Sequence, residues 1–239
     1  MRALFAALAG VVLLGASAPQ IERLGKVRTA IVLPNGAPLG SVILIPGGTT
    51  TQTIAADGAP GNASNFVIRI RGDLADAGFA IAYVEDPSDL RPVIARMRAI
   101  ARPVFLLGTS NGTAVETRIA STLGADGPDG VVLTSTVTRS SRQFPYSAAA
   151  ADVRRIAVPV LFVHNRNDGC SVSPPSGIAP LMARFAPGAD VTRIDVASDK
   201  ILGDPCEPLS PHGYLGIESD VTAKIVAWMK AHGARESPR

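Results

Sequence analysis

The sequence predicts an α/β domain, in which helices cover both faces of a mostly parallel central sheet. Short continuous runs of Val, Ile and Leu recur along the chain, which is typical of strands buried on both faces. Segments with helical spacing of apolar residues separate these runs. The length of 239 residues, with 46% hydrophobic and 18% charged residues, suits one domain with a full core.

The N-terminus is predicted to be a signal peptide over residues 1–18, so that residues 19–239 form the single domain. Arg2 supplies a positive start, residues 4–14 are apolar, and residues 15–18 are small, as at a cleavage site. The apolar stretch is too short to cross a bilayer, which takes about 20 residues. Cleavage after Ala16 or after Ala18 fits, and a buried N-terminal helix is the alternative. We therefore expect an exported protein, periplasmic or secreted, with no stable membrane insertion.

Strands and helices alternate through the first half of the domain. A strand is expected over 27–33, followed by Pro34-Asn35-Gly36, a sequence typical of a hairpin. The β-branched run 41–45 predicts a buried strand, and a Gly-rich loop follows to about residue 62. Apolar spacing predicts a helix over 65–77, ended by Gly78, and the run 79–84 predicts another buried strand. Ser88 is the expected N-cap of a helix that carries Leu90, Ile94, Met97 and Ile100.

The second half continues the alternation. The strand expected over 103–107 leads into a helix over 111–123, and further strands are expected at 130–133, 158–164 and 191–196. Helices are expected at 175–185 and 217–231. The segment 134–157 is too short for a lid of several helices, which predicts a minimal cap and an open site.

The sequence Gly108-Thr109-Ser110-Asn111-Gly112 joins a predicted strand to a predicted helix. A serine on such a sharp turn is held out of the sheet with its hydroxyl exposed, and the glycines permit the close approach of strand and helix. Because five residues match by chance easily, the remaining chain has to supply the partners that a serine nucleophile needs.

A serine hydroxyl needs a base, and the base needs an orienting acid. His212 lies between Pro211 and Gly213, in a loop after the last strand, and is the expected base. The other two histidines are expected to be structural or solvated: His164 ends a strand, and His232 lies near the C-terminus.

Asp168 follows the end of a predicted strand and is the expected acid. In mostly parallel sheets the chemistry lies beyond the carboxyl ends of the strands, where each of these residues is placed. The alternative acids are Asp86, Asp195 and Asp199, each more typical of a turn or cap.

Two cysteines bracket these partners. Cys170 is two residues after Asp168, and Cys206 is six residues before His212. In an exported chain they can pair, and a disulfide would tie the acid loop to the base loop. Two free buried thiols are the alternative.

The oxyanion of an acyl-transfer reaction needs two backbone N–H donors. We expect one from Asn111, directly after the nucleophile, and one from Gly48 in the Pro46-Gly47-Gly48-Thr49 loop, with Thr49 in reserve. An ordinary tight turn is the alternative for that loop.

These residues together resemble the α/β-hydrolase superfamily, and more narrowly small exported bacterial α/β-hydrolases of unassigned substrate. The resemblance rests on residues 108–113, on Asp168-Gly169-Cys170 and on residues 206–213, and covers about residues 41–228. It implies an esterase-like enzyme with Ser110, Asp168 and His212 as triad. Pro46 departs from the family, which usually has His before the glycine pair. The family's Asn-Phe-x-x-Arg-x-Arg stretch is matched by residues 65–71, for which the residues alone indicate only a helix with solvated arginines.

The sequence therefore predicts a serine hydrolase of small or medium carboxylic esters that needs no metal or cofactor. A peptidase or acyltransferase with the same triad, or a non-catalytic binding protein of the same fold, is the alternative. A net charge of +3 and 5% aromatic residues make nucleic-acid binding unlikely, so a small-molecule ester is the expected partner.

Overall fold

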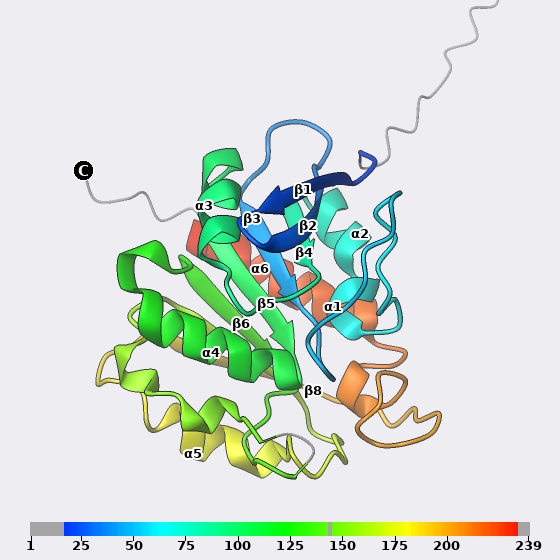
Figure 1. The fold of residues 1–239 in the computed structure, drawn as a ribbon. Helices are drawn as coiled ribbons and strands as arrows, with labels where there is room; N and C mark the ends of the chain where they lie inside the picture. Colours follow the sequence, from blue (N-terminus) through cyan, green and yellow to red (C-terminus); the bar gives the residue numbers. More distant parts are fainter. Residues whose placement is uncertain (1–16, 143–144, 234–239) are drawn as a thin grey trace, which may run out of the picture.

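The computed structural model describes residues 17–142 and 145–233. In these ranges eight strands form one sheet with the order β1-β2-β4-β3-β5-β6-β7-β8 (Figure 1). All neighbours from β4 to β8 are parallel, whereas β1 and β2 are antiparallel to their neighbours. The strands are β1 (Gln20–Leu24), β2 (Val27–Val32), β3 (Ser41–Ile45), β4 (Ala80–Val84), β5 (Val104–Thr109), β6 (Gly130–Thr134), β7 (Val160–Asn165) and β8 (Val191–Val196).

Helices cover both faces of this sheet, as predicted (Figure 1). On one face lie α3 (Arg91–Ile100), α4 (Asn111–Leu123) and α5 (Ile178–Met182), and on the other α1 (Phe66–Arg69), α2 (Arg71–Asp76) and α6 (Glu218–Gly233). Side chains of β5 show the alternation: Phe105 and Leu107 join the core under α6, and Leu106 joins the core under α3. Both faces of the central strands are therefore buried, which explains their continuous apolar sequences.

The prediction of a hairpin after β2 is wrong. β2 pairs with β1 and β4, not with β3, and the tight hairpin is the one between β1 and β2, where Gly25 has φ +62°. Turn residues such as Pro34-Asn35-Gly36 specify that the chain reverses, but not which strand it meets next. The fully buried β3 takes a central position between β4 and β5.

Two helices differ from their predicted form. The helix expected over 65–77 is divided at Ile70, whose φ and ψ of −85° and 2° interrupt the α conformation between α1 and α2. Ser88 does not cap a helix: α3 begins at Arg91, and the Arg91 N–H donates to Asp89 Oδ1 at 3.2 Å. The N-cap position is Leu90, which makes no side-chain capping bond, and Asp89 just before it accepts from the first helical N–H.

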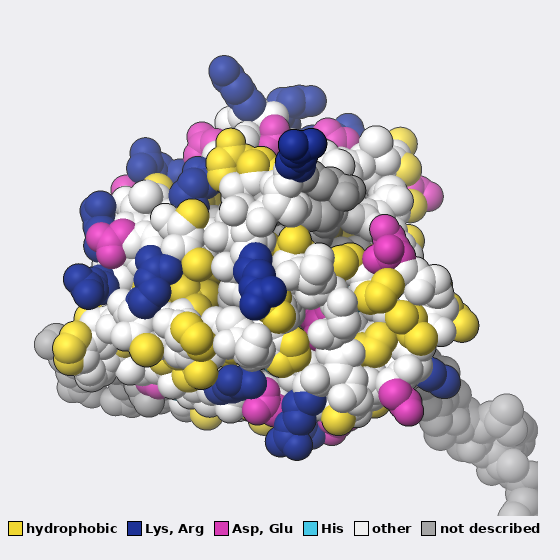
Figure 2. All heavy atoms as spheres, turned by 90° about the horizontal axis from the view of Figure 1, so that it is seen from below, with side chains coloured by type: hydrophobic (Ala, Val, Ile, Leu, Met, Phe, Trp, Pro, Cys, Tyr) yellow, Lys and Arg dark blue, Asp and Glu magenta, His cyan; other side chains and the backbone are white. Residues whose placement is uncertain are grey.

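Residues 1–16, which hold most of the predicted signal peptide, lie outside the described residues. None of the helices described here has the length and apolar character needed to cross a membrane. Figure 2 looks onto the end of the molecule at which the parallel strands terminate, and there Lys and Arg side chains are spread among acidic and uncharged ones.

Candidate active site

Ser110 lies at the junction of β5 and α4, in a strained conformation. Its φ of 53° and ψ of −125° are rare for a residue with a side chain, and such strain is concentrated at functional sites. The Ser110 N–H donates to Thr134 O at 3.0 Å, so β6 holds the turn. A Cβ on Gly112 would lie 2.3 Å from Ile45 O, so only glycine lets α4 approach β3 this closely. The predicted strand–turn–helix setting of Ser110 is therefore present.

His212 and Asp168 meet beyond the carboxyl ends of the strands. Asp168 follows β7, and His212 lies in a 3₁₀ turn at Pro211–Gly213 before α6. His212 Nδ1 donates to Asp168 Oδ2 at 2.9 Å, and both side chains are almost fully buried. The other Asp168 oxygen, Oδ1, accepts from the Cys170 N–H at 2.9 Å. The carboxylate is thus fixed, and Nε2 is left as the histidine's available nitrogen.

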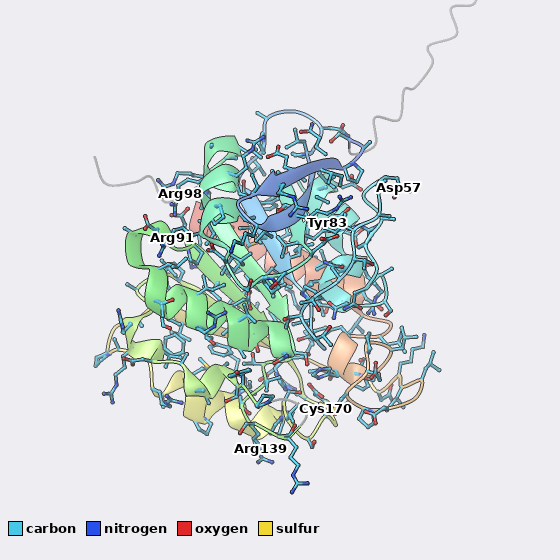
Figure 3. The ribbon with its side chains drawn as sticks, viewed as in Figure 1. Asp57, Tyr83, Arg91, Arg98, Arg139 and Cys170 are labelled. Carbon is cyan, nitrogen blue, oxygen red and sulfur yellow. A yellow bond between two sulfur atoms is a disulfide. The ribbon has the colours of Figure 1, made fainter. Side chains whose placement is uncertain are left out.

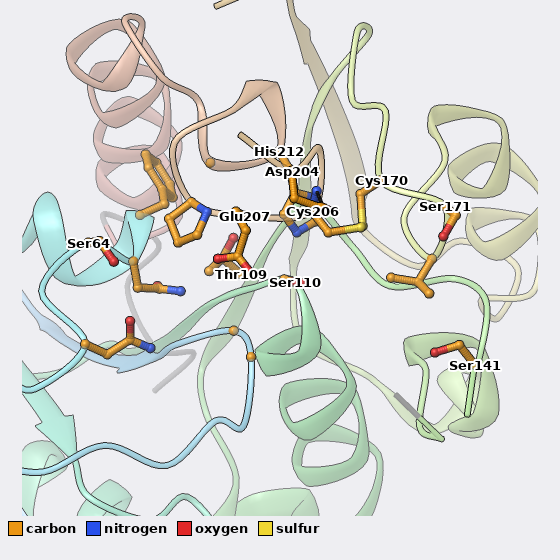
Figure 4. A pocket seen from close by; sticks show the side chains of 18 of the residues that line it. Ser64, Thr109, Ser110, Ser141, Cys170, Ser171, Asp204, Cys206, Glu207 and His212 are labelled. Carbon is orange, nitrogen blue, oxygen red and sulfur yellow. Dashed lines mark hydrogen bonds between the residues drawn. A yellow bond between two sulfur atoms is a disulfide. The ribbon is translucent and has the colours of Figure 1, made fainter. Parts of the chain in front are cut away.

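Ser110 and His212 line the same pocket, of about 650 Å³. In Figure 4 Ser110 lies at the turn between strand and helix, His212 reaches toward it from the opposite loop, and the disulfide runs beside His212. His212 Nε2 is buried and has no hydrogen-bond partner among the described residues. The hydrogen bond between a serine hydroxyl and a histidine base is often long in unliganded enzymes, and it shortens when substrate binds.

Two residues that the sequence did not single out for the site contact the acid. Ser173 Oγ donates to Asp168 Oδ2 at 3.0 Å and lies 3.0 Å from His212 Nδ1. His164 Nε2 lies 3.0 Å from Ser173 O and 3.6 Å from Asp168 Oδ2. Burial lowers the pKa of His164 to about 4, so this histidine is neutral at pH 7. The His164 ring lies against Asp168 and does not line the pocket.

The disulfide between Cys170 and Cys206 is formed, as predicted. Cys170 lies at the carboxyl edge of the sheet (Figure 3), and both cysteines line the pocket with His212. The bond therefore joins the loop that carries Asp168 to the loop that carries His212.

The Gly48 loop and the start of α4 are held together by a side chain. Asn111 Nδ2 donates to Gly48 O at 2.8 Å, and Gly48 has φ +68°. Gly48 lines the pocket of Ser110, whereas Asn111 and Thr49 line a neighbouring pocket of about 560 Å³. In the described chain, the N–H groups of Asn111 and Gly48 do not donate to other backbone groups, so both can serve a ligand.

Tyr214 fixes the peptide that follows His212. It has a left-handed backbone with φ 60°, is fully buried, and packs its ring 4.5 Å from that of Phe66. Its hydroxyl donates to Val163 O at 2.7 Å and accepts from Ser135 N at 2.8 Å. Ser135 Oγ in turn donates to His212 O at 2.6 Å. The histidine backbone is therefore tied to the ends of β6 and β7.

A buried carboxyl lies beneath the turn that carries Ser110. Glu116 of α4 is fully buried, and neither of its oxygens has a hydrogen-bond partner among the described residues. A Cβ on Gly108 would lie 2.4 Å from Glu116 Oε2, so glycine is needed there to make room for the carboxyl. Burial raises the pKa of Glu116 well above its usual value and so favours the protonated form.

The other candidate residues lie elsewhere. Asp86 lines the neighbouring pocket, and Asp195 pairs with Arg193 at 2.9 Å. His232 is not simply solvated, because its ring stacks on Trp228 with centroids 4.1 Å apart. Tyr146 also lines the neighbouring pocket. Among the described residues no group of His, Cys, Asp and Glu is arranged to hold a metal ion.

No family model matches the sequence, and no curated protein matches it. Solved structures match over most of the chain. Est1E from Butyrivibrio proteoclasticus is 14% identical with a TM-score of 0.58, covering 92% of this chain and 100% of its own. MGS-M1, an α/β hydrolase from a deep-sea metagenome of the Medee basin, is 12% identical with a TM-score of 0.61, covering 91% and 99%.

A third match is dienelactone hydrolase from Anabaena variabilis, 12% identical with a TM-score of 0.61, covering 89% of this chain and 98% of its own. The chain has the α/β-hydrolase fold. At these identities the likeness concerns the fold. It confirms the fold class that the elbow, the glycine loop and the late Asp and His predicted.

Proposed function

We propose that this α/β-hydrolase-fold protein is a serine hydrolase of small or medium carboxylic esters. The observation that carries the proposal is that the strained Ser110 shares a pocket with His212, whose Nδ1 is bonded to Asp168. A nucleophile, a base and an orienting acid are the parts that acyl transfer needs.

In the proposed mechanism Ser110 Oγ attacks the ester carbonyl carbon, and His212 Nε2 takes the hydroxyl proton. The electron pair of the carbonyl moves onto its oxygen, which accepts from the N–H groups of Asn111 and Gly48. The tetrahedral intermediate expels the alcohol, which receives the proton from Nε2. Water, deprotonated by the same nitrogen, then cleaves the acyl-enzyme and releases the acid. Asp168 stabilises the imidazolium throughout.

Ser173 is the other serine near the base, but its position does not suit a nucleophile. It is fully buried, it contacts Nδ1 rather than Nε2, and it is absent from the pocket lining. We assign it a positioning role, in which its hydroxyl contacts both the Asp168 carboxylate and the His212 imidazole.

The pocket favours substrates that are polar near the ester. The charged side chains of the lining are Arg142, Asp204 and Glu207. Hydroxyl and amide side chains also line it: Asn62, Ser64, Asn65, Thr109, Ser110, Ser141 and Ser171. Long alkyl chains would leave such groups without partners, which costs about 1–3 kcal/mol for each buried one. Short or hydroxylated acyl and alcohol groups therefore fit better than fatty acyl chains.

Export is part of the proposal. A disulfide persists in oxidising compartments and is rare in the cytosol, which supports a periplasmic or secreted protein. Non-reducing mass analysis of protein from the periplasm tests this point, because two free thiols there would contradict it.

Labelling with a fluorophosphonate probe, followed by peptide mapping, tests the nucleophile. We expect the wild type to be labelled on Ser110, the Ser110→Ala variant to be unlabelled, and its kcat for p-nitrophenyl acetate to fall about 10⁴-fold or more. Ser173→Ala is the matched control and should still be labelled on Ser110. An unlabelled wild type would favour a non-catalytic binding protein, and label on Ser173 would refute the assignment.

Esters and amides of the same acyl groups separate the remaining activities. Hydrolysis of p-nitrophenyl esters of graded length should decline beyond short chains, whereas aminoacyl nitroanilides should not be cleaved. Efficient cleavage of the anilides would indicate a peptidase, and transfer of the acyl group to added alcohols in preference to water would indicate an acyltransferase.

A further inference from the structure

The residues 65–71, left as a helix with solvated arginines by their sequence, lie at the pocket instead. Asn65 occupies the N-cap position of α1, where Asn normally accepts from the first helical N–H groups. Its side chain makes no such bond. It lines the pocket of Ser110, and the residue is only 6% exposed.

Asn65 Oδ1 is buried without a hydrogen-bond partner among the described residues. Leaving such an atom unpaired costs about 1–3 kcal/mol. Asn65 makes no capping bond, and its oxygen is unpaired within the described chain. Its side chain therefore contributes little to stability at this position. A buried amide left partly unpaired calls for an explanation, and a catalytic role is one. Oδ1 itself can only accept, so the donor of this amide is Nδ2.

Gly47 lies between the Asn65 amide nitrogen and Ser110 and is packed close to both. A Cβ placed on Gly47 would lie 2.8 Å from Ser110 Cβ and 3.5 Å from Asn65 Nδ2. The backbone of Gly47 does not have a positive φ, so its conformation does not require glycine. A Cβ at Gly47 would instead collide with Ser110 Cβ, so glycine lets this loop approach the serine closely. Ser110 and Asn65 thus both lie beside Gly47 and line one pocket, in which an acyl group bonded to Ser110 would lie.

Arg69 fixes this segment to the loop of the base. Its Nη1 donates to Ser64 O at 2.5 Å and to Pro208 O at 3.2 Å. Its Nη2 donates to Gly213 O at 2.6 Å and to Glu218 Oε1 at 2.9 Å. The guanidinium thus joins the segment before α1 to both sides of the 3₁₀ turn that carries His212. The amide of Asn65 and the imidazole are held at a fixed spacing, as preorganised catalysis requires.

We propose that Asn65 is a further catalytic residue, whose Nδ2–H donates to the oxyanion together with the N–H groups of Asn111 and Gly48. This inference rests on the proposed acyl transfer at Ser110. The hydrogen bond strengthens as the carbonyl oxygen gains charge, so it lowers the barrier more than it raises substrate affinity.

Steady-state kinetics of two Asn65 variants test the proposal. Removing one oxyanion donor costs about 10²–10³-fold in kcat, so we expect Asn65→Ala to lose about 100-fold in kcat on p-nitrophenyl acetate, with KM changed less than about threefold. Asn65→Asp has nearly the same shape but no donor when ionised, and should be at least as slow. Affinity for a trifluoromethyl ketone, which forms an oxyanion on Ser110, should fall in parallel with kcat.

Asn35→Ala is the matched control, because Asn35 is an exposed asparagine between β2 and β3 that lines neither pocket. It should retain kcat within about threefold. Asn65→Ala should melt within a few degrees of the wild type, since it removes an unpaired atom. Near wild-type kcat in Asn65→Ala, full activity in Asn65→Asp, or an effect confined to KM would overturn the inference. If Ser110→Ala is then inactive, the proposed function survives, whereas a wild type without esterase activity or label overturns both.

Discussion

Removal of the Cys170–Cys206 disulfide should lower the melting temperature by a predictable amount. The cysteines are 36 positions apart, so the bond closes a loop that the unfolded chain would otherwise sample freely. For this loop length the chain-entropy relation gives about 4 kcal/mol. A domain of this size loses roughly 2–4 °C per kcal/mol, which predicts a fall of roughly 8–16 °C.

Calorimetry under non-reducing conditions measures this fall, and two variants separate its causes. Cys206→Ser breaks the bond and leaves Cys170 in the core, where it packs with Val137 and Val172. The double variant Cys170→Ala with Cys206→Ala also removes that packing and should melt slightly lower. If Cys206→Ser melts within about 2 °C of the wild type, the loop is already constrained by other contacts and the reasoning fails.

Three further substitutions test the glycine turn and the buried titratable groups. Gly112→Ala places a methyl group 2.3 Å from Ile45 O and should destabilise by about 1–3 kcal/mol in urea unfolding, whereas Gly72→Ala, in open space, should be neutral or stabilising; equal effects would contradict the close approach. Burial lowers the pKa of His164 to about 4, so the unfolded chain binds this proton first as the pH falls below 6.5. The free energy of unfolding should therefore drop by roughly 3 kcal/mol between pH 6.5 and 4 because of this residue. The His164→Gln variant should lack this pH dependence. Burial raises the pKa of Glu116, so the folded chain keeps a proton that the unfolded chain loses, and the free energy of unfolding should decline above about pH 4.5; a Glu116→Gln variant with an unchanged slope would show that the carboxyl titrates normally.

The strands, and the grouping of Ser110, Asp168 and His212 at one edge of the sheet, were largely predictable from the sequence. The β-branched runs at Ser41–Ile45 and Val191–Val196 are strands over those same residues, because local sequence decides a fully buried or regular strand. Ser110, Asp168 and His212 each follow the end of a strand, and parallel strands bring such ends to one edge. That geometric rule explains why residues more than 40 positions apart could be grouped without a structure.

The partners that depend on long-range contacts were not predictable. Arg69 looks like a surface arginine by its spacing, but its acceptors Pro208 and Gly213 are 139 and 144 residues away. The hydroxyl of Ser173 reaches His212 across 39 residues. Periodicity and turn chemistry describe local preferences, so they contain no information about these contacts. The misplaced hairpin after β2 has the same origin, since strand order is a property of the whole sheet.

Tyr214, two residues after His212, affects the pH range over which the loop of His212 keeps its shape. Burial raises the pKa of Tyr214 above that of an ordinary phenol, so its hydroxyl continues to donate to Val163 O in alkaline solution. The tie between the histidine loop and the sheet therefore does not loosen as hydroxide becomes abundant. The buried phenol would therefore stay neutral at pH values at which an exposed tyrosine ionises.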